Sequence, residues 1–163
     1  SEETTDKEEA NADEADSDEE EAAEAEADEA EAELEAAIEV ENDLRSEIVT
    51  YALQFVGNRY KYGGTNPNTG VDCSGFTSYV MRHAAEVELP HSSGGQSRMG
   101  RQVSSSEMRP GDIICYGSGK RINHVALYIG NGQIVHASTE RTGIKVSRWN
   151  YRTPVRIVNV LGD

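Results

Sequence analysis

One of the two cysteines stands where a thiol could act as a nucleophile. Cys73 follows Asp72, a residue type that caps helices, and precedes an apolar stripe at helical spacing formed by Phe76, Val80 and Ala84. Free backbone N–H groups and the helix dipole stabilise a thiolate at the start of a helix. The position therefore predicts a helix beginning at Cys73 and a lowered thiol pKa.

The alternative for each cysteine is a buried structural role, which is common for free thiols. Cys115 lies inside the apolar run DIICY and is predicted to be such a residue. Cys73 lies outside the apolar stripe of its own helix, and its neighbours Ser74 and Gly75 are small. We therefore interpret Cys73 as the nucleophile and Cys115 as part of the core.

A thiol nucleophile needs a base, and the base needs a partner that orients it. Of the four histidines, His83 is expected on the surface and His91 lies in a loop that could border a cleft. His124 and His136 lie on consecutive predicted strands joined by residues 130–132. From spacing alone, these two histidines could equally be unrelated surface or core residues.

The register of this hairpin decides whether the two histidines meet. A two-residue turn would place them on opposite faces, whereas a three-residue Gly-Asn-Gly loop pairs Leu127 with Val135 and brings His124 and His136 to one face. The second register also separates apolar from polar residues best. A Cys–His–His triad follows, provided that the Cys73 helix packs beside that face.

The elements that would position these residues form an α+β pattern. A helix is predicted over residues 44–56, a Gly- and Asn-rich loop up to Asp72, and a second helix from Cys73, whereas residues 89–111 are loop-like. Short strands follow. They are residues 112–116, 124–130, 133–138, 144–149 and 155–161. Helices followed by an antiparallel sheet indicate the α+β class.

Charge divides the chain into two expected parts. Residues 1–43 hold 22 of the 30 acidic residues and one lysine, a net charge of −21, whereas residues 44–163 carry a net charge of +6. Residues 1 to about 30 contain no large apolar residue, so they are predicted to be disordered, with a transient helix over residues 31–43. We expect an acidic arm or linker, residues 1–43, and a domain, residues 44–163.

Several classes are excluded or disfavoured. No apolar run approaches the roughly 20 residues of a membrane helix, no stretch holds several adjacent basic residues, and two cysteines cannot form a disulfide scaffold. Neither CxxC nor HExxH is present, which disfavours zinc. The chain lacks an initiator Met and a signal sequence, so we expect it to derive from something longer.

Four ordered motifs resemble the NlpC family of cell-wall cysteine peptidases. They are YKYGGTNPNTGVDCSGF, LPHSSGGQ, MRPGDIICYG and INHVALYIGNGQIVHAS, and the match runs from about Leu44 to the C-terminus. The resemblance implies a papain-like α+β fold and cleavage of peptidoglycan stem peptides, with the γ-D-glutamyl–diamino acid bond favoured. It also implies a secreted or cell-envelope location and no cofactor, and we expect a monomer that does not bind nucleic acid and does not insert into a membrane.

The resemblance also assigns roles to individual residues. Cys73 matches the nucleophile, His124 the general base and His136 the orienting residue, and Tyr60 matches a tyrosine that helps hold the oxyanion. The expected contacts with substrate are Asp72, Ser74, Tyr62 and His91, although His91 stands where relatives often carry Arg. The alternatives are an amidase or acyltransferase on the same scaffold, and a catalytically silent wall-binding module.

Overall fold

The structure is a computed structural model that describes residues 2–163, with side chains described from Glu19 onward. Its contacts divide the chain into two units, one ending at Glu41 and the other running from Asn42 to Asp163. The boundary predicted from charge, between residues 43 and 44, lies two residues further along. No helix in the described part of the chain is long and apolar enough to cross a membrane.

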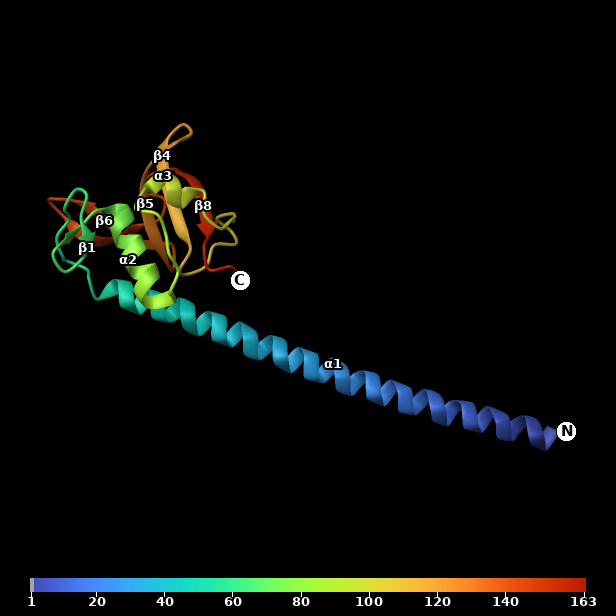
Figure 1. The fold of residues 1–163 in the computed structure, drawn as a ribbon. Coiled ribbons are helices and arrows are strands. Elements are labelled where there is room, and N and C mark those ends of the chain that lie inside the picture. Colours follow the sequence, from blue (N-terminus) through green and yellow to red (C-terminus); the bar gives the residue numbers. More distant parts are fainter. Residues whose placement is uncertain (1) are drawn as a thin grey trace. The chain divides into compact units, whose positions relative to one another are not determined.

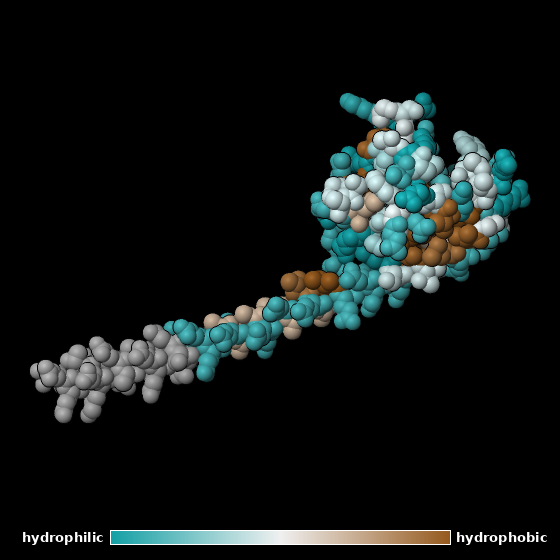
Figure 2. Space-filling model, turned by 180° about the vertical axis from the view of Figure 1, so that it is seen from behind, coloured by the Kyte–Doolittle hydropathy of each residue, from teal (hydrophilic) through white to brown (hydrophobic). Residues whose placement is uncertain are grey.

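Helix α1, Glu2–Leu53, contains the whole acidic segment that the structure describes. The predicted disorder falls in part on residues 1–18, which lie outside the described side chains. Residues 19–43, however, are continuous helix, where disorder up to about residue 30 and a transient helix beyond it were expected. Every side chain of residues 19–40 is exposed, so packing does not account for this helix (Figure 2). The physical reason is the high helix propensity of Ala and Glu.

The last turns of α1 belong to the second unit and have a buried face. Ile48 and Ala52 are fully buried there, and Phe55 is buried just after the helix. These are residues of the stripe that predicted a helix over residues 44–56. The chain then leaves through Gly57, whose φ of 94° suits glycine.

An antiparallel sheet of six strands follows, in the order β3-β8-β4-β5-β6-β7 (Figure 1). The strands are β3 Arg101–Gln102, β4 Ile113–Ser118, β5 Arg121–Gly130, β6 Gln133–Thr139, β7 Gly143–Arg148 and β8 Pro154–Asn159. All five predicted strands are present. Two short pieces were not predicted, namely β3 and the separate ladder of β1, Thr65–Asn66, with β2, Gly70–Val71.

Helix α2, Cys73–Ala85, begins at the predicted residue, and the Asp72 side chain accepts a hydrogen bond from the Gly75 N–H as the N-cap. Its buried residues include Phe76 and Val80. A short helix, α3 Ser93–Ser97, interrupts the segment that was predicted to be a loop. In Figure 1 both helices lie against the sheet, close to β5.

The two faces of the sheet carry separate apolar clusters. On one face, Val125 and Leu127 of β5 pack in the cluster that contains Phe76 and Val80 of α2. The residues between them, such as Ala126, belong to a second cluster on the opposite face, together with Tyr116 and Ile134. Side chains alternate between the faces of a strand, so the parity of a residue determines which cluster it joins.

The predicted register of the β5–β6 hairpin is confirmed, but the connecting loop differs from the expected one. Leu127 pairs with Val135 as predicted, whereas Gly130 rather than Ile129 pairs with Gln133. The connection is therefore a two-residue Asn131-Gly132 turn, both residues with positive φ, preceded by a bulge. The extra residue in the bulge restores the register that a simple two-residue turn would have shifted.

Candidate active site

The Cys73 thiol lies at the first residue of α2 and is partly exposed, whereas the Cys115 side chain is fully buried. Three backbone N–H groups interact favourably with the Cys73 sulfur. Two belong to Cys73 and Ser74, at the start of α2, and the third belongs to Val125 on β5. The thiol is thus held between the helix start and the central strand.

The prediction of a lowered pKa for the Cys73 thiol is wrong. Burial raises the pKa of this thiol, and the nearby Asp72 carboxylate raises it further. The N–H groups of Val125, Ser74 and Cys73 act in the opposite direction but do not outweigh the loss of solvent. Burial raises the pKa of Cys115 further still, to about 12. Cys73 is therefore the thiol with the lower pKa of the two, as expected from the sequence.

His124 and His136 lie on one face of the hairpin and contact each other directly. Nε2 of His124 is 2.7 Å from Nδ1 of His136, a hydrogen bond between two buried rings. Burial lowers the pKa of His124 to about 4, with a smaller contribution from Arg152. Burial and the neighbouring His124 lower the pKa of His136 to about 3. Both rings are therefore neutral at pH 7.

The predicted triad was conditional on the Cys73 helix packing beside the histidine face, and α2 packs on the other face of the sheet. His124 has the parity of Ala126 and lies against Tyr116, on the face opposite to α2. Cys73 nevertheless reaches β5 because the β5–β6 ladder ends at the pair of Leu127 with Val135. Beyond that pair the Val125 N–H interacts with the thiol instead of with β6, and Val125 directly follows His124.

Aromatic and cationic groups surround the histidine pair. The Tyr151 ring lies 5.4 Å from the His136 ring and 5.3 Å from the Tyr116 ring, measured between centroids. Arg152 lies over the Tyr116 ring and donates a hydrogen bond to the Asn123 side chain. Tyr151 is also close enough to Cys73 for the thiolate to raise its pKa, after burial as the main cause. The histidine pair therefore lies against two tyrosine rings, with a cation nearby.

The two candidate tyrosines differ in position. Tyr60 is half-buried, and a Cys73 thiolate is, after burial, the next cause of its raised pKa, which places it beside the nucleophile. Its backbone forms a parallel bridge with Val71, just before the N-cap of α2. Tyr62, by contrast, is 85% exposed. Of the two, Tyr60 is the one positioned to contact a group bound at the thiol.

The expected substrate contacts other than Tyr62 lie together at the start of α2. The Asp72 carboxylate accepts hydrogen bonds from the backbone of Gly63 and Gly75 and lies 2.7 Å from Nε2 of His91. Ser74 is buried, and its hydroxyl is 3.5 Å from the same carboxylate. Asp72 therefore organises the loop and helix start, in addition to any contact with substrate.

Two residues that the sequence analysis missed support the site. The hydroxyl of Ser147, on β7, lies 2.9 Å from Nε2 of His136 and extends the chain of polar groups by one member. Gln96 of α3 is fully buried, and its amide donates to the carbonyl of Ser74. Gln96 is unusual because it is buried although its segment is polar. The sequence does not reveal this burial, so it could not have identified Gln96.

Comparison with known proteins identifies a family over most of the second unit. Residues 57–157 match the NlpC/P60 family. A relative from Escherichia coli K12, "Murein DD-endopeptidase MepS/Murein LD-carboxypeptidase", is 41% identical over 108 residues, which cover 66% of this chain and 56% of that protein. A "Probable endopeptidase p60" from Listeria seeligeri is 42% identical over 98 residues, or 60% of this chain and 18% of that protein.

Solved structures give the same result for the fold. The crystal structure of the NlpC/p60 domain of the peptidoglycan hydrolase SagA superposes with a TM-score of 0.65 at 32% identity, covering 71% of this chain and 97% of that one. The α+β prediction is thereby confirmed. The chain spans little more than half of the E. coli relative, and less than a fifth of the L. seeligeri one.

Proposed function

Because the chain belongs to the NlpC/P60 family, we propose that it is a cysteine endopeptidase that hydrolyses the stem peptides of peptidoglycan. One observation carries the proposal. A partly exposed thiol at a helix start contacts the strand that holds a hydrogen-bonded pair of neutral histidines. A wall-binding module would need none of these groups. A secreted or cell-envelope location is part of the same proposal.

The hydrogen-bond chain fixes which nitrogen acts as the base. For His124 to accept the thiol proton at Nδ1, its Nε2 must carry the ring hydrogen and donate it to Nδ1 of His136. His136 then carries hydrogen on Nε2 and donates to the Ser147 hydroxyl. In this arrangement all donors point the same way, and two partners in sequence stabilise the tautomer of His124 that the reaction needs.

The raised pKa of the Cys73 thiol and the lowered pKa of His124 favour a neutral resting pair over a thiolate–imidazolium pair. The thiol proton therefore passes to His124 as the sulfur attacks the substrate carbonyl, forming the S–C bond and an oxyanion. The backbone N–H groups of Cys73 and Ser74, with the Tyr60 hydroxyl, stabilise that oxyanion.

The acyl-enzyme forms and breaks down with the same groups. Collapse of the oxyanion expels the amine, which takes its proton from the His124 imidazolium. His124 then removes a proton from water, and the resulting hydroxide attacks the thioester. The carboxylic acid leaves and the Cys73 thiol is restored. No step needs an added redox partner.

The bond we favour joins γ-D-glutamate to a diamino acid. A second candidate comes from the E. coli relative, whose name specifies DD-endopeptidase and LD-carboxypeptidase activities on murein. Digestion of purified peptidoglycan followed by mass spectrometry of the fragments distinguishes the bonds. Fragments ending in γ-glutamate support the first, whereas release of single D-amino acids or opened cross-links supports the second.

Thiol alkylation separates an enzyme from a silent module. Iodoacetamide should modify Cys73 much faster than Cys115, whose thiol is fully buried with a pKa of about 12. Cys73→Ala should abolish release of wall fragments and retain the fold, with Cys115→Ala as the matched control. Fragment release by folded Cys73→Ala protein would exclude the mechanism. Prompt alkylation of Cys73 without wall hydrolysis would favour an amidase or acyltransferase.

A further inference from the structure

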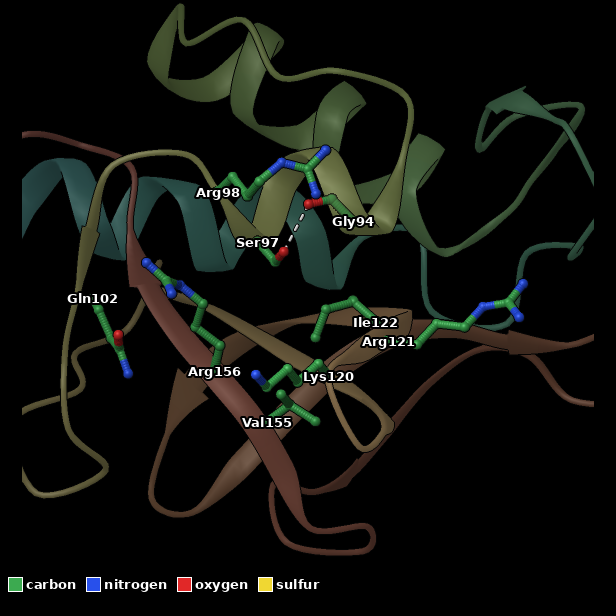
Figure 3. A pocket seen from close by; sticks show the side chains of 9 residues that line it. All are labelled: Gly94, Ser97, Arg98, Gln102, Lys120, Arg121, Ile122, Val155 and Arg156. Atoms are coloured by element: carbon green, nitrogen blue, oxygen red, sulfur yellow. Dashed lines mark hydrogen bonds between the residues drawn. The ribbon is translucent and has the colours of Figure 1, made fainter.

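Outside the candidate active site, a cavity of about 490 Å³ is lined by a concentration of positive charge. Its lining comes from α3, from the hairpin between β4 and β5, and from β8 (Figure 3). Four of the lining residues are cationic and none is acidic, namely Arg98, Lys120, Arg121 and Arg156. Unneutralised charge of one sign in a concave site favours an anionic ligand.

These four cations form no ion pair in the part of the chain whose side chains are described, from Glu19 onward. The Nε–H of Arg156 is buried without a hydrogen-bond partner in the same described part. Buried donors are rarely left unsatisfied in folded proteins, so this group is one that a bound acceptor would complete.

The floor of the cavity is apolar. Ile122 and Val155 line the cavity beside the cationic side chains in Figure 3, where Lys120 extends from the turn between β4 and β5, Arg156 extends from β8, and Arg98 lies over α3. An apolar floor below a cationic rim suits an aliphatic side chain or peptide that ends in a carboxylate. A polyhydroxylated phosphodiester would gain little from Ile122 and Val155, so these contacts favour a peptide carboxylate.

The cavity is connected to the candidate active site through two elements. Ile122 precedes Val125 by three residues on β5, a distance of roughly 10 Å along a strand, and the Val125 N–H contacts the Cys73 thiol. On the other side, Gln96 of α3 donates to the Ser74 carbonyl in the first turn of α2. About three extended peptide residues would span the same distance.

We propose that this cavity is a subsite for a free carboxylate of the substrate peptide, about three residues away from the bond that is cleaved. The proposal rests on the proposed function. The exposed ends of Arg98 and Lys120 attract and orient the carboxylate, and Arg156 donates to it from below. The subsite thus selects peptides with a free acid over peptides in which that acid is amidated or absent.

The test uses two synthetic stem peptides that contain the γ-D-glutamyl–diaminopimelate bond, one with a free C-terminal carboxylate and one with a C-terminal amide. The full chain should cleave the free acid with a kcat/KM about fivefold to tenfold higher, through KM rather than kcat. Arg98→Gln/Lys120→Gln, which changes two exposed side chains, should remove this preference. Arg148→Gln removes an exposed charge outside the cavity and should preserve it.

Binding to the Cys73→Ala protein, measured by calorimetry, separates the subsite from the reaction. Tighter binding of the acid than of the amide, lost in the Arg98→Gln/Lys120→Gln background, supports the subsite even if the wild-type chain cleaves neither peptide. Failure to cleave either peptide would refute only the favoured bond of the proposed function. Cleavage of both peptides with equal kcat/KM would overturn the subsite and leave the function standing. Binding of soluble poly(glycerol phosphate) that depends on the same two residues, with no discrimination between the peptides, would also overturn it.

Discussion

At the scale of single residues, the Ser147 hydroxyl stands at the end of the hydrogen-bond chain that begins at His124. It lies at Nε2 of His136, on the side of that ring away from His124, so we treat it as a positioning residue. Ser147→Ala should leave Nε2 of His136 without its acceptor and let the ring turn. We expect kcat to fall by about threefold to tenfold with KM unchanged, because the loss is one hydrogen bond.

The comparison with His136 makes this test specific. His136→Ala removes the direct partner of His124 and should lower turnover by about 10² to 10⁴, by analogy with the orienting residue of a Ser–His–Asp triad. His136→Asn or His136→Gln should retain part of the activity through a substitute hydrogen bond. Ser147→Thr keeps the hydroxyl and should restore most of the turnover lost in Ser147→Ala. Equal activity of Ser147→Ala and wild type would show that the hydroxyl is dispensable.

The protonation state of His124 gives a prediction for the pH profile. With a pKa lowered to about 4 by burial and by Arg152, this base remains neutral well below pH 6.5. The acid limb of kcat/KM should therefore lie near pH 4, and activity at pH 5.5 should match that at pH 7. Arg152→Gln should raise the pKa of His124 and move the limb to higher pH, whereas Arg148→Gln should not. An acid limb at pH 6.5 in the wild type would contradict the neutral pair.

Circular dichroism must accompany that profile because the same pKa shifts act on stability. The unfolded chain takes up protons at His124 and His136 near pH 6.5, while the folded state resists until about pH 4 and 3. The unfolded state therefore binds more protons between these values, and stability falls as the pH decreases from 6.5. Measurements of activity are informative only where the fold persists.

The residue types at the site could be predicted from the sequence, but their environments could not. Cys73, His124 and His136 stand out because their side chains carry chemistry and their spacing implies geometry. The pKa of Cys73 depends on how far the sulfur is desolvated, which is set by neighbours distant in sequence such as Tyr60 and Tyr151. Ser147 gave no signal, since serine is common on exposed strands.

At the scale of elements, the β5–β6 hairpin shows why a correct register arose from an incorrect loop. The apolar pattern fixes which residues share a face, and shifting the pairing by one residue would bury polar groups. The positive φ of Gly130 lets the strand bulge just before the Asn131-Gly132 turn. The apolar pattern therefore determined the register, whereas the turn has a conformation different from the predicted one. Helix α3 was missed because five residues give no periodicity.

Arg45 tests how the end of α1 is held to the rest of its unit. Arg45 is 2% exposed, and its guanidinium lies 3.0 Å from Asp112 and donates to Asp163 as well as to the Pro110 carbonyl. Arg45→Met should lower the free energy of unfolding by about 3 to 5 kcal/mol, because two carboxylates lose their buried partner. Urea denaturation measures this loss.

The control for Arg45 is an ion pair of the same type on the surface. Arg82 and Glu88 form a hydrogen-bonded pair, but their side chains are 57% and 71% exposed. Arg82→Met should therefore change the free energy of unfolding by less than about 1 kcal/mol. If both substitutions lower the free energy of unfolding equally, burial does not strengthen the ion pairs of Arg45.

Acid should weaken the ion pairs of Arg45 only at low pH, because Arg45 lowers the pKa of Asp163 to about 2.

At the scale of the whole molecule, charge divides the chain more clearly than secondary structure does. Helix α1 runs across the division between the two units, which lies between Glu41 and Asn42. The charge distribution predicted a boundary after residue 43, and no residue before Leu34 has a large apolar side chain. Composition could not predict a continuous helix, since helix propensity and mutual repulsion of carboxylates act in opposite directions over this segment.

Two truncations test whether the acidic segment contributes to the stability of the second unit. Residues 19–40 bury no side chain, so removing residues 1–40 should change Tm by no more than about 2 °C and leave cleavage of stem peptides intact. Removing residues 1–47 also deletes Arg45 and should lower Tm by well over 10 °C, because the buried carboxylate of Asp112 loses its ion-pair partner and Asp163 keeps only its contact with Arg109. Differential scanning calorimetry of both proteins at 0.1 M and 0.5 M NaCl measures the effect. A large loss of Tm in the shorter truncation, reduced at high salt, would show that the acidic segment stabilises the domain electrostatically and is more than a spacer.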